Sequence, residues 1–276
     1  MILYIQPIFV PDEERFTQNK NSLVSFGEYI KKYPYDIKCM FGGWVYNNKW
    51  WEKIYKVIKD NIPSNMLLEP IRFDKNYGKA YVVNNLYEKA KTLDFDFFLS
   101  VDSDIIFSTT TNNLFERLYD IGIESPSIIK KPFGFAALQQ TGNCRHQLAN
   151  VNQYYIKNRF NEQEALLQPS QPSGLGGGCL FINRKFWDKI GGYKVMGVYA
   201  GDDAYLTHDA SLVGCSYQLA SNILIMHPPE SDQEYVEWKY KMLHNGSYDG
   251  KNRNMLELSN DVKIYDEFWE TKLEDK

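Results

Sequence analysis

Two aspartates, Asp102 and Asp104, directly follow an apolar run that the sequence predicts to be a buried parallel strand over residues 97–101. Open α/β sheets bind ligands in the crevice outside the carboxyl ends of such strands. Two carboxylates spaced i and i+2 point the same way in an extended chain, and they repel each other without a cation between them. Mg²⁺ or Mn²⁺ relieves that repulsion and keeps coordination positions for phosphate oxygens. We therefore predict a metal–diphosphate site here, although a strand that simply ends in an acidic turn has the same sequence.

A second candidate region is the segment Asn76-Tyr77-Gly78-Lys79, between a predicted strand and a predicted helix. Gly78 permits close approach of the backbone, and Lys79 begins a helix at the end where backbone N–H groups attract an anion. A phosphate contact and an ordinary Asn/Gly loop are both compatible with this segment.

Three later motifs likewise allow both a functional and a purely structural interpretation. Gly176-Gly177-Gly178 leads into a predicted strand, either because a ligand must approach the backbone or because the chain bends tightly. Asp202-Asp203 begins a helix, where acids are favoured by the helix dipole and where Asp203 can also act as a general base. His227 ends an apolar strand and can supply an imidazole ligand, although a lone histidine is more often structural.

The elements that must position these residues alternate in type. The hydrophobic pattern predicts strands over residues 2–9, 36–41, 65–73 and 97–101 and helices over residues 17–32, 50–62 and 79–93. Such alternation with short links predicts βαβ units and a parallel sheet. Beyond it we expect a helix over 111–121, an irregular segment over 124–173, a helix over 183–190, a strand ending at His227 and a helix over 231–245.

Length and composition restrict the class of protein. The chain has 276 residues, enough for one large domain with an appendage, and its net charge of −4 gives no global basic field for a polyanion. The four cysteines form no C-x-x-C pair, which favours reduced thiols of an intracellular protein. The N-terminus lacks the pattern of a signal peptide, and no apolar run reaches the roughly 20 residues of a membrane span. We therefore expect a cytoplasmic protein without a membrane span.

In chain order, these motifs resemble those of the GT-A glycosyltransferases, especially the family-2-like and galactosyltransferase-like branches. The run from Gly177 to Tyr193, which ends in Ile190-Gly191-Gly192-Tyr193, is similar to a passage of that family. The resemblance implies a Rossmann-like α/β domain over residues 1–230, with a mostly parallel sheet flanked by helices. Residues 124–173 would then be an acceptor-side insertion, and residues 231–276 a C-terminal helical extension.

The resemblance also implies a reaction. It is the metal-dependent, inverting transfer of a hexosyl or pentosyl group from a nucleoside diphosphate, most commonly UDP, to a hydroxyl. Asp102, Asp104 and His227 would hold Mn²⁺ or Mg²⁺, and Asp203 would act as the base. Asp202 stands where the family usually has glutamate, which puts its role in positioning the acceptor in question. The implied donor-binding residues are Gln6, Pro7, Asn76, Gly78, Lys79, Asp102, Gly177 and Gly178.

A late passage offers alternatives. Phage-encoded members of the family often carry a His-Gly…Arg passage, and here His244 precedes Asn245-Gly246, with Lys251 and Arg253 beyond. His244 is therefore the alternative metal ligand to His227, and Lys251 or Arg253 would contact the diphosphate. A phage-encoded enzyme would work in the host cytoplasm.

The acceptor is the least determined part. Residues 128–160 carry five basic residues and no Asp or Glu, interleaved with aromatic and amide side chains. That composition suits nucleic acid, so one hypothesis is a sugar transferase for 5-hydroxymethylcytosine in phage DNA; a solvent-exposed insertion is the alternative. A glycan, a lipid-linked sugar or a protein would also offer a hydroxyl. Two other classes stay open, a non-catalytic sugar- or nucleic-acid-binding relative and a nucleotidyltransferase, although residues 6–15 lack the basic Gly-rich loop of the latter. The sequence predicts no oligomeric state.

Overall fold

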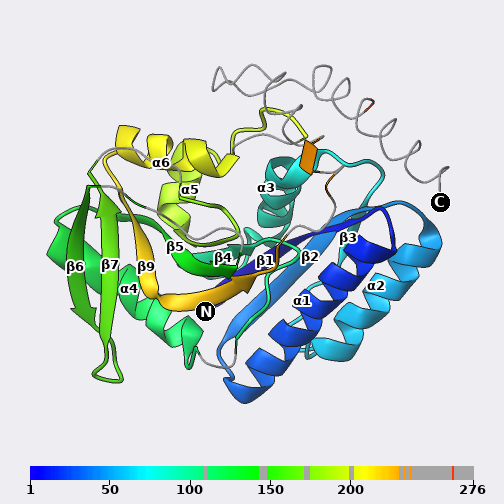
Figure 1. Cartoon of the computed structure of the whole chain (residues 1–276), viewed down its shortest axis with the longest axis horizontal. Helices are drawn as coiled ribbons and strands as arrows, with labels where there is room; N and C mark the ends of the chain where they lie inside the picture. The colour runs from blue at the N-terminus through cyan, green and yellow to red at the C-terminus, as the bar shows by residue number, and fades with distance from the viewer. Residues whose placement is uncertain are drawn as a thin grey trace.

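A computed structural model describes residues 1–108, 111–142, 148, 150–170, 175–198, 202–229, 233, 236, 237 and 263. The described chain forms one nine-stranded sheet with helices on both faces (Figure 1). The strands are β1 (Ile2–Val10), β2 (Ile37–Val45), β3 (Ile71–Phe73), β4 (Phe97–Val101), β5 (Phe133–Gly142), β6 (Val151–Lys157), β7 (Gln163–Pro169), β8 (Cys179–Asn183) and β9 (Ser216–His227). The helices are α1 (Glu13–Lys32), α2 (Asn48–Asn61), α3 (Gly78–Ala90), α4 (Leu114–Ile129), α5 (Arg184–Ile190) and α6 (Asp202–Leu212).

The first half of the sheet follows the predicted βαβ pattern. The strand order is β3-β2-β1-β4-β8-β5-β9-β7-β6, and the pairs β1–β2, β1–β4 and β2–β3 are parallel. β8, however, runs antiparallel to both β4 and β5, and β7 runs antiparallel to β6 and β9. The sheet is therefore mixed, and the expectation of a mostly parallel sheet was wrong. A short buried apolar strand has the same composition in either direction, so the sequence did not reveal the reversal of β8.

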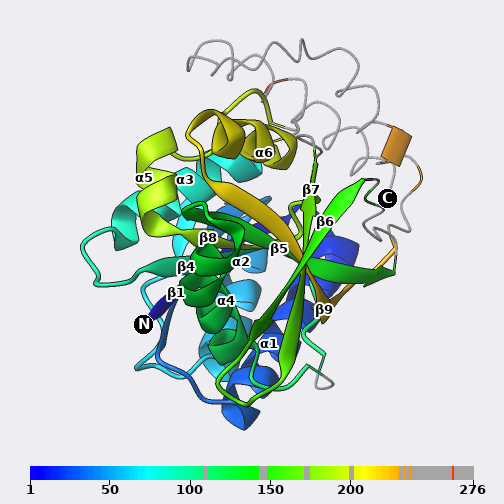
Figure 2. The same cartoon turned by 90° about the vertical axis from the view of Figure 1, so that its left-hand side faces the viewer.

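The sheet is the middle of three layers (Figure 2). Tyr4 of β1 packs in a core with side chains of α1, α2 and α4, whereas its neighbour Leu3 packs in a second core with α3, α5 and α6. Successive residues of a strand point to opposite faces of the sheet, and β1 is apolar on both. Because β1 is buried on both faces, its position in the sheet is fixed. Its carboxyl end lies at the edge of the sheet where the candidate residues lie.

Short polar caps set where the helices begin. The Asp12 carboxylate accepts the Arg15 N–H at 2.9 Å, so α1 begins four residues before the predicted start. The Asn183 side chain caps α5 in the same way, and Gly191, with φ of 77°, follows its last residue Ile190, the end predicted for this helix.

Two expectations about strand ends were wrong. The strand predicted over residues 36–41 does not end before Gly42 and Gly43; β2 continues to Val45 alongside β1. A side chain at Gly43 would put its Cβ 1.8 Å from the Ile8 carbonyl oxygen, so the glycine is needed for this close approach inside the sheet. β3 is three residues long rather than nine.

The segment expected to be irregular, residues 124–173, contains the end of α4 and three strands. β5 lies in the interior of the sheet between β8 and β9, and β6 and β7 form an antiparallel hairpin beside β9 (Figure 1). The buried pair Arg117–Glu164, at 2.6 Å, ties α4 to this hairpin. Turn residues and amides masked the strand pattern of this segment in the sequence.

The C-terminal helical extension predicted over residues 231–276 lies outside the described residues, apart from the isolated residues 233, 236, 237 and 263. Within the described ranges, no helix combines the length and the apolar composition that crossing a membrane requires.

Candidate active site

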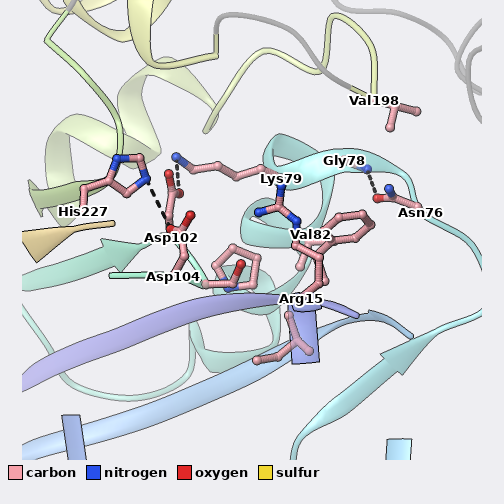
Figure 3. A pocket seen from close by; sticks show the side chains of 13 residues that line it. Arg15, Asn76, Gly78, Lys79, Val82, Asp102, Asp104, Val198 and His227 are labelled. Atoms are coloured by element: carbon pink, nitrogen blue, oxygen red, sulfur yellow. Dashed lines mark hydrogen bonds and ion pairs between the residues drawn. The ribbon is translucent and has the colours of Figure 1, made fainter. Parts of the chain in front are cut away.

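Three of the predicted metal ligands lie together. One ligand atom each of Asp102, Asp104 and His227 lies within 4.8 Å of the other two, and all three side chains are partly exposed (Figure 3). The i, i+2 spacing in an extended chain was an incomplete explanation. Only Asp102 directly follows β4, and Asp104 lies in a turn. In this turn the Ile105 N–H donates a hydrogen bond of 3.3 Å to the Asp102 carbonyl. The turn, rather than an extended i, i+2 spacing, brings the two carboxylates together.

His227 reaches this group because β9 is locked to the segment after β4. Ile106 and Met226 exchange two backbone hydrogen bonds of 2.9 and 3.1 Å, and β5 pairs Gly142 with His227. The imidazole Nε2 of His227 consequently lies 3.4 Å from Asp104 Oδ1. A contact between residues more than one hundred positions apart has no signal in the local sequence.

Lys79 enters the site from the first turn of α3. Its Nζ lies 2.7 Å from Asp102 Oδ1 and donates a hydrogen bond of 2.9 Å to the Gly177 carbonyl. Asn76 accepts the Gly78 N–H at 3.1 Å, and Gly78 has φ of +83°, which shapes the turn that delivers Lys79. A lysine is disfavoured by the dipole at a helix N-terminus, and the Asp102 carboxylate compensates for it here.

Asp203 contacts the glycine loop at the point that Lys79 also approaches. Its Oδ2 accepts the Gly177 N–H at 2.6 Å. A Cβ at Gly177 would lie 2.9 Å from Asp203 Oδ2 and 2.9 Å from Lys79 Nζ, so both side chains crowd the same point on the loop. The loop needs glycine there because its own neighbours approach it, which is a different reason from the ligand approach considered in the sequence.

Gly178 has a similar explanation. Its carbonyl oxygen accepts the Asp102 N–H at 2.8 Å, and a Cβ on it would lie 2.7 Å from Gln140 Nε2. The antiparallel pairing of β8 with β4 therefore continues into the loop and holds it against Asp102.

A cavity of about 220 Å³ opens at this edge of the sheet. Pro7, Asn76, Gly78 and Lys79 line it together with the Asp102, Asp104 and His227 group. Gly177, Gly178 and Asp203 are not among its described lining residues. Gly177 accepts a hydrogen bond from the lining residue Lys79, and Gly178 accepts one from the lining residue Asp102.

The structure does not bring Gln6 to the cavity. Its side chain is fully buried, accepts a hydrogen bond from the Tyr4 hydroxyl at 2.8 Å and donates one to Ser22 Oγ at 2.9 Å. The amide therefore joins β1 to α1 in the core. The side chain of Asp202 and all of His244, Lys251 and Arg253 lie outside the described residues.

Sequence reasoning missed Arg15. This guanidinium is 8% exposed and lines the cavity from the first turn of α1 (Figure 3). No motif surrounds it, but one signal was available: Asp12 caps a helix that follows the end of β1, which places the first turn of that helix at the ligand-binding edge of the sheet.

Several side chains of the basic segment over residues 128–160, considered above for nucleic-acid binding, make contacts within the protein itself. Phe133 and Phe135 are buried in the sheet, so they offer no surface for stacking bases. Arg159 donates to both carboxylate oxygens of Asp120, with Nη2 2.7 Å from Oδ1. These contacts weaken the case for a DNA-binding insertion.

Cys179 begins β8 and pairs with Val101, the residue before Asp102. Burial raises the pKa of its thiol well above the usual value, and the nearby Asp102 carboxylate raises it further, whereas Lys79 lowers it. The thiol is therefore protonated at neutral pH and is a poor metal ligand, which leaves oxygen and imidazole donors at the site.

Solved structures share this architecture. Structures of TarS from S. aureus, residues 1–349, match 90% of this chain and 67% of that chain with a TM-score of 0.53 at 14% identity, and, with UDP-GlcNAc bound, 86% and 61% with a TM-score of 0.53 at 12% identity. GalNAc-T7 with UDP, GalNAc and Mn²⁺ matches 84% of this chain and 44% of its own, with a TM-score of 0.58 at 10% identity.

The fold is GT-A-like. Neither a protein-family model nor the sequence of a characterised protein matches the chain. This GT-A-like chain spans less than half of the GalNAc-T7 chain, and identities of 10–14% relate folds rather than activities.

Proposed function

We propose that the protein is a metal-dependent glycosyltransferase that takes a sugar from a nucleoside diphosphate, with UDP the first candidate. The observation that carries the proposal is the Asp102–Asp104–His227 group in a cavity at the carboxyl edge of a GT-A-like sheet. Among the similar structures, TarS is in complex with UDP-GlcNAc, and GalNAc-T7 is with UDP, GalNAc and Mn²⁺.

The donor set of the group fits a divalent cation. Two carboxylates and one imidazole offer hard oxygen ligands with one nitrogen, which suits Mn²⁺ better than Mg²⁺ because Mg²⁺ strongly prefers oxygen. Asp104 and His227 would hold the ion, with Asp102 beside them. When bound, the ion would supply positive charge for the departing diphosphate.

Lys79 suits the stabilisation of the same leaving group. Its ammonium lies 2.7 Å from Oδ1 of the candidate metal ligand Asp102 and donates a hydrogen bond to the Gly177 carbonyl. A cation fixed in place before reaction stabilises negative charge that develops on the leaving diphosphate without a reorganisation cost.

Asp203 is the candidate base for the acceptor hydroxyl. It is partly exposed, and its Oδ2 accepts the Gly177 N–H at 2.6 Å, which holds in place the carboxylate that would take the proton as the hydroxyl attacks the anomeric carbon. One base opposite the leaving group corresponds to inversion of configuration. Asp202, next to it, stays the proposed partner in acceptor positioning.

The acceptor is proposed only as a hydroxyl group. 5-Hydroxymethylcytosine in DNA stays a prediction, and it now depends on basic residues other than Arg159. A glycan and a lipid-linked sugar are the other arms of the acceptor test.

The test is a thermal-shift screen of nucleoside diphosphates and their sugar derivatives, each with and without MnCl₂. A ligand that binds the folded state raises the melting temperature, and at a hundred times its Kd it stabilises by about 2.7 kcal/mol. We expect a shift with one nucleotide that needs the metal, and loss of that shift in Asp104→Asn. A wild-type protein that no nucleotide stabilises would refute the proposal.

A turnover assay then separates an enzyme from a non-catalytic binding protein. With the donor identified, release of free nucleoside diphosphate is followed in the presence of hydroxymethylcytosine DNA, oligosaccharides and a lipid-linked sugar. Turnover that Asp203→Asn abolishes while donor binding persists supports a transferase; binding without turnover on any acceptor favours the non-catalytic alternative.

A further inference from the structure

We propose that Lys79 competes with the divalent cation for the Asp102 carboxylate, and that a diphosphate ends this competition by drawing the ammonium to itself. The inference rests on the proposed function, which supplies the cation and the diphosphate. It gives Lys79 a role in specificity, because the site then discriminates against a free divalent cation and accepts one together with a nucleoside diphosphate.

The first observation is the position of the ammonium. Its Nζ lies 2.7 Å from Asp102 Oδ1, and Asp102 belongs to the group of three residues whose ligand atoms lie within 4.8 Å of one another (Figure 3). A divalent cation bound by this group would share the Asp102 carboxylate with the ammonium. Two positive charges beside one carboxylate repel each other, so each weakens the binding of the other.

The second observation is the environment of Asp102 Oδ1. This oxygen is buried and accepts no hydrogen bond from the described residues, and its charge is compensated by the ion pair with Lys79. A buried carboxylate oxygen without a hydrogen bond is uncommon, because its lost hydration is not replaced. Such an oxygen keeps the electron pairs that a metal ligand needs, and the ammonium lies against it.

The third observation is how Lys79 is held. It lines the cavity from the first turn of α3, and it donates a hydrogen bond of 2.9 Å to the Gly177 carbonyl. A lysine ammonium is a compact charge on a flexible stem, so it can turn from one anion to another. A phosphate oxygen in the cavity can therefore replace Asp102 as the partner of Lys79, while the Gly177 contact keeps the ammonium in the site.

The consequence is a coupling between two ligands. A diphosphate that draws Lys79 away from Asp102 removes the repulsion at the metal group, and it thereby tightens binding of the cation. By linkage, the cation tightens binding of the diphosphate by the same factor. Direct contact between the cation and the phosphates also couples the two ligands, so variants are needed to measure the share that belongs to Lys79.

The first test measures Mn²⁺ binding by calorimetry without nucleotide. Lys79→Met should bind Mn²⁺ about tenfold more tightly than the wild type, because the competing charge is gone. Lys79→Arg keeps the charge and should bind Mn²⁺ no more tightly than the wild type. The gain in Lys79→Met should disappear in the double variant Lys79→Met/Asp104→Asn, because the ion then lacks one of the three candidate ligands.

The second test repeats the titrations in saturating UDP, with a correction for the Mn²⁺ that UDP binds in solution. The factor by which UDP tightens Mn²⁺ binding should be about tenfold larger in the wild type than in Lys79→Met. Should another nucleoside diphosphate be the best ligand in the thermal-shift screen, it replaces UDP here.

Lys194→Met is the matched control for the loss of an ion-paired ammonium. Lys194 Nζ also lies 2.7 Å from a carboxylate oxygen, that of Asp209, and 26% of its side chain is exposed against 22% for Lys79. It is not among the described lining residues of the cavity, so this variant should bind Mn²⁺ as the wild type does. The melting temperature of each variant without ligand checks that the fold is intact.

Each result decides the question. Equal Mn²⁺ affinity of the wild type and Lys79→Met, including no detectable binding by either, overturns the inference, and the proposed function then depends on the thermal-shift screen alone. An equal gain in Lys194→Met overturns it too, because the effect would then come from net charge. An unchanged factor for UDP in Lys79→Met refutes the part assigned to the diphosphate. If no nucleotide binds the wild type, the proposed function fails and this inference with it.

Discussion

The ammonium of Lys79 lies 2.7 Å from Asp102 Oδ1 while it donates a hydrogen bond to the Gly177 carbonyl. One side chain thus links the strand that carries the metal group to the loop that binds Asp203. The candidate metal ligands and the candidate base are therefore parts of one hydrogen-bonded arrangement rather than two independent sites.

Replacing Lys79 by Met should lower turnover about a hundredfold or more, because a preorganised donor to the leaving group is lost. The donor should still bind, more weakly, because the metal group remains. Steady-state kinetics at saturating donor measures the effect. Lys79→Arg keeps the charge and should retain more activity; equal activity of Lys79→Met and the wild type would contradict the role.

Replacing Gly177 by Ala should lower turnover about a hundredfold with a smaller effect on donor affinity. The new Cβ would lie 2.7 Å from Asp203 Cβ and 2.9 Å from Lys79 Nζ, so both side chains must move, and a displacement of about 1 Å is costly in catalysis. Gly214→Ala is the control for an added methyl group: a Cβ there meets nothing within 4 Å, but the φ of +74° strains the backbone, so the melting temperature of both variants is measured beside their kinetics. Similar kinetics for the two variants would argue against a functional role for the loop.

Replacing Arg117 by Met should lower the free energy of unfolding by about 3–5 kcal/mol, because it leaves a buried carboxylate without its ion pair. Glu164 is fully buried, and Arg117 binds both of its oxygens, at 2.6 and 2.8 Å. Denaturant unfolding gives the value. The double variant Arg117→Met/Glu164→Leu should recover much of the loss, and a single variant as stable as the wild type would show that the pair is not needed.

Stability should fall as the pH rises above about 10, the usual pKa of tyrosine. Burial raises the pKa of the Tyr87 hydroxyl well above that value, and its hydrogen bond to Asp188 raises it further; burial also raises the pKa of Tyr29. The unfolded chain then loses these protons before the folded chain does, so alkaline pH favours unfolding.

Unfolding midpoints measured between neutral and alkaline pH test this dependence. Tyr87→Phe removes one of the groups and should make the alkaline decline shallower. An unchanged slope would mean that Tyr87 ionises at the same pH in both states.

The expectation that the early elements alternate as βαβ was correct from β1 to β4, because each of these elements carries its own hydrophobic period and its own caps. Periodicity is a local property, and it also identified the Asp102–Asp104 pair at the end of a buried strand. The helix that begins at Asp202 and the end of α5 at Ile190 were predicted for the same reason.

The sequence by itself determined which residue types stand at the ends of strands and at the beginnings of helices, and so which chemistry they can support. Only the tertiary structure decided that β8 runs antiparallel, that residues 133–142 lie inside the sheet and that Ile106 pairs with Met226 to bring His227 to Asp104. It likewise placed Arg15 in the cavity and turned Gln6 into the core. These are contacts between distant segments, and they depend on how whole elements pack rather than on the composition of any one of them.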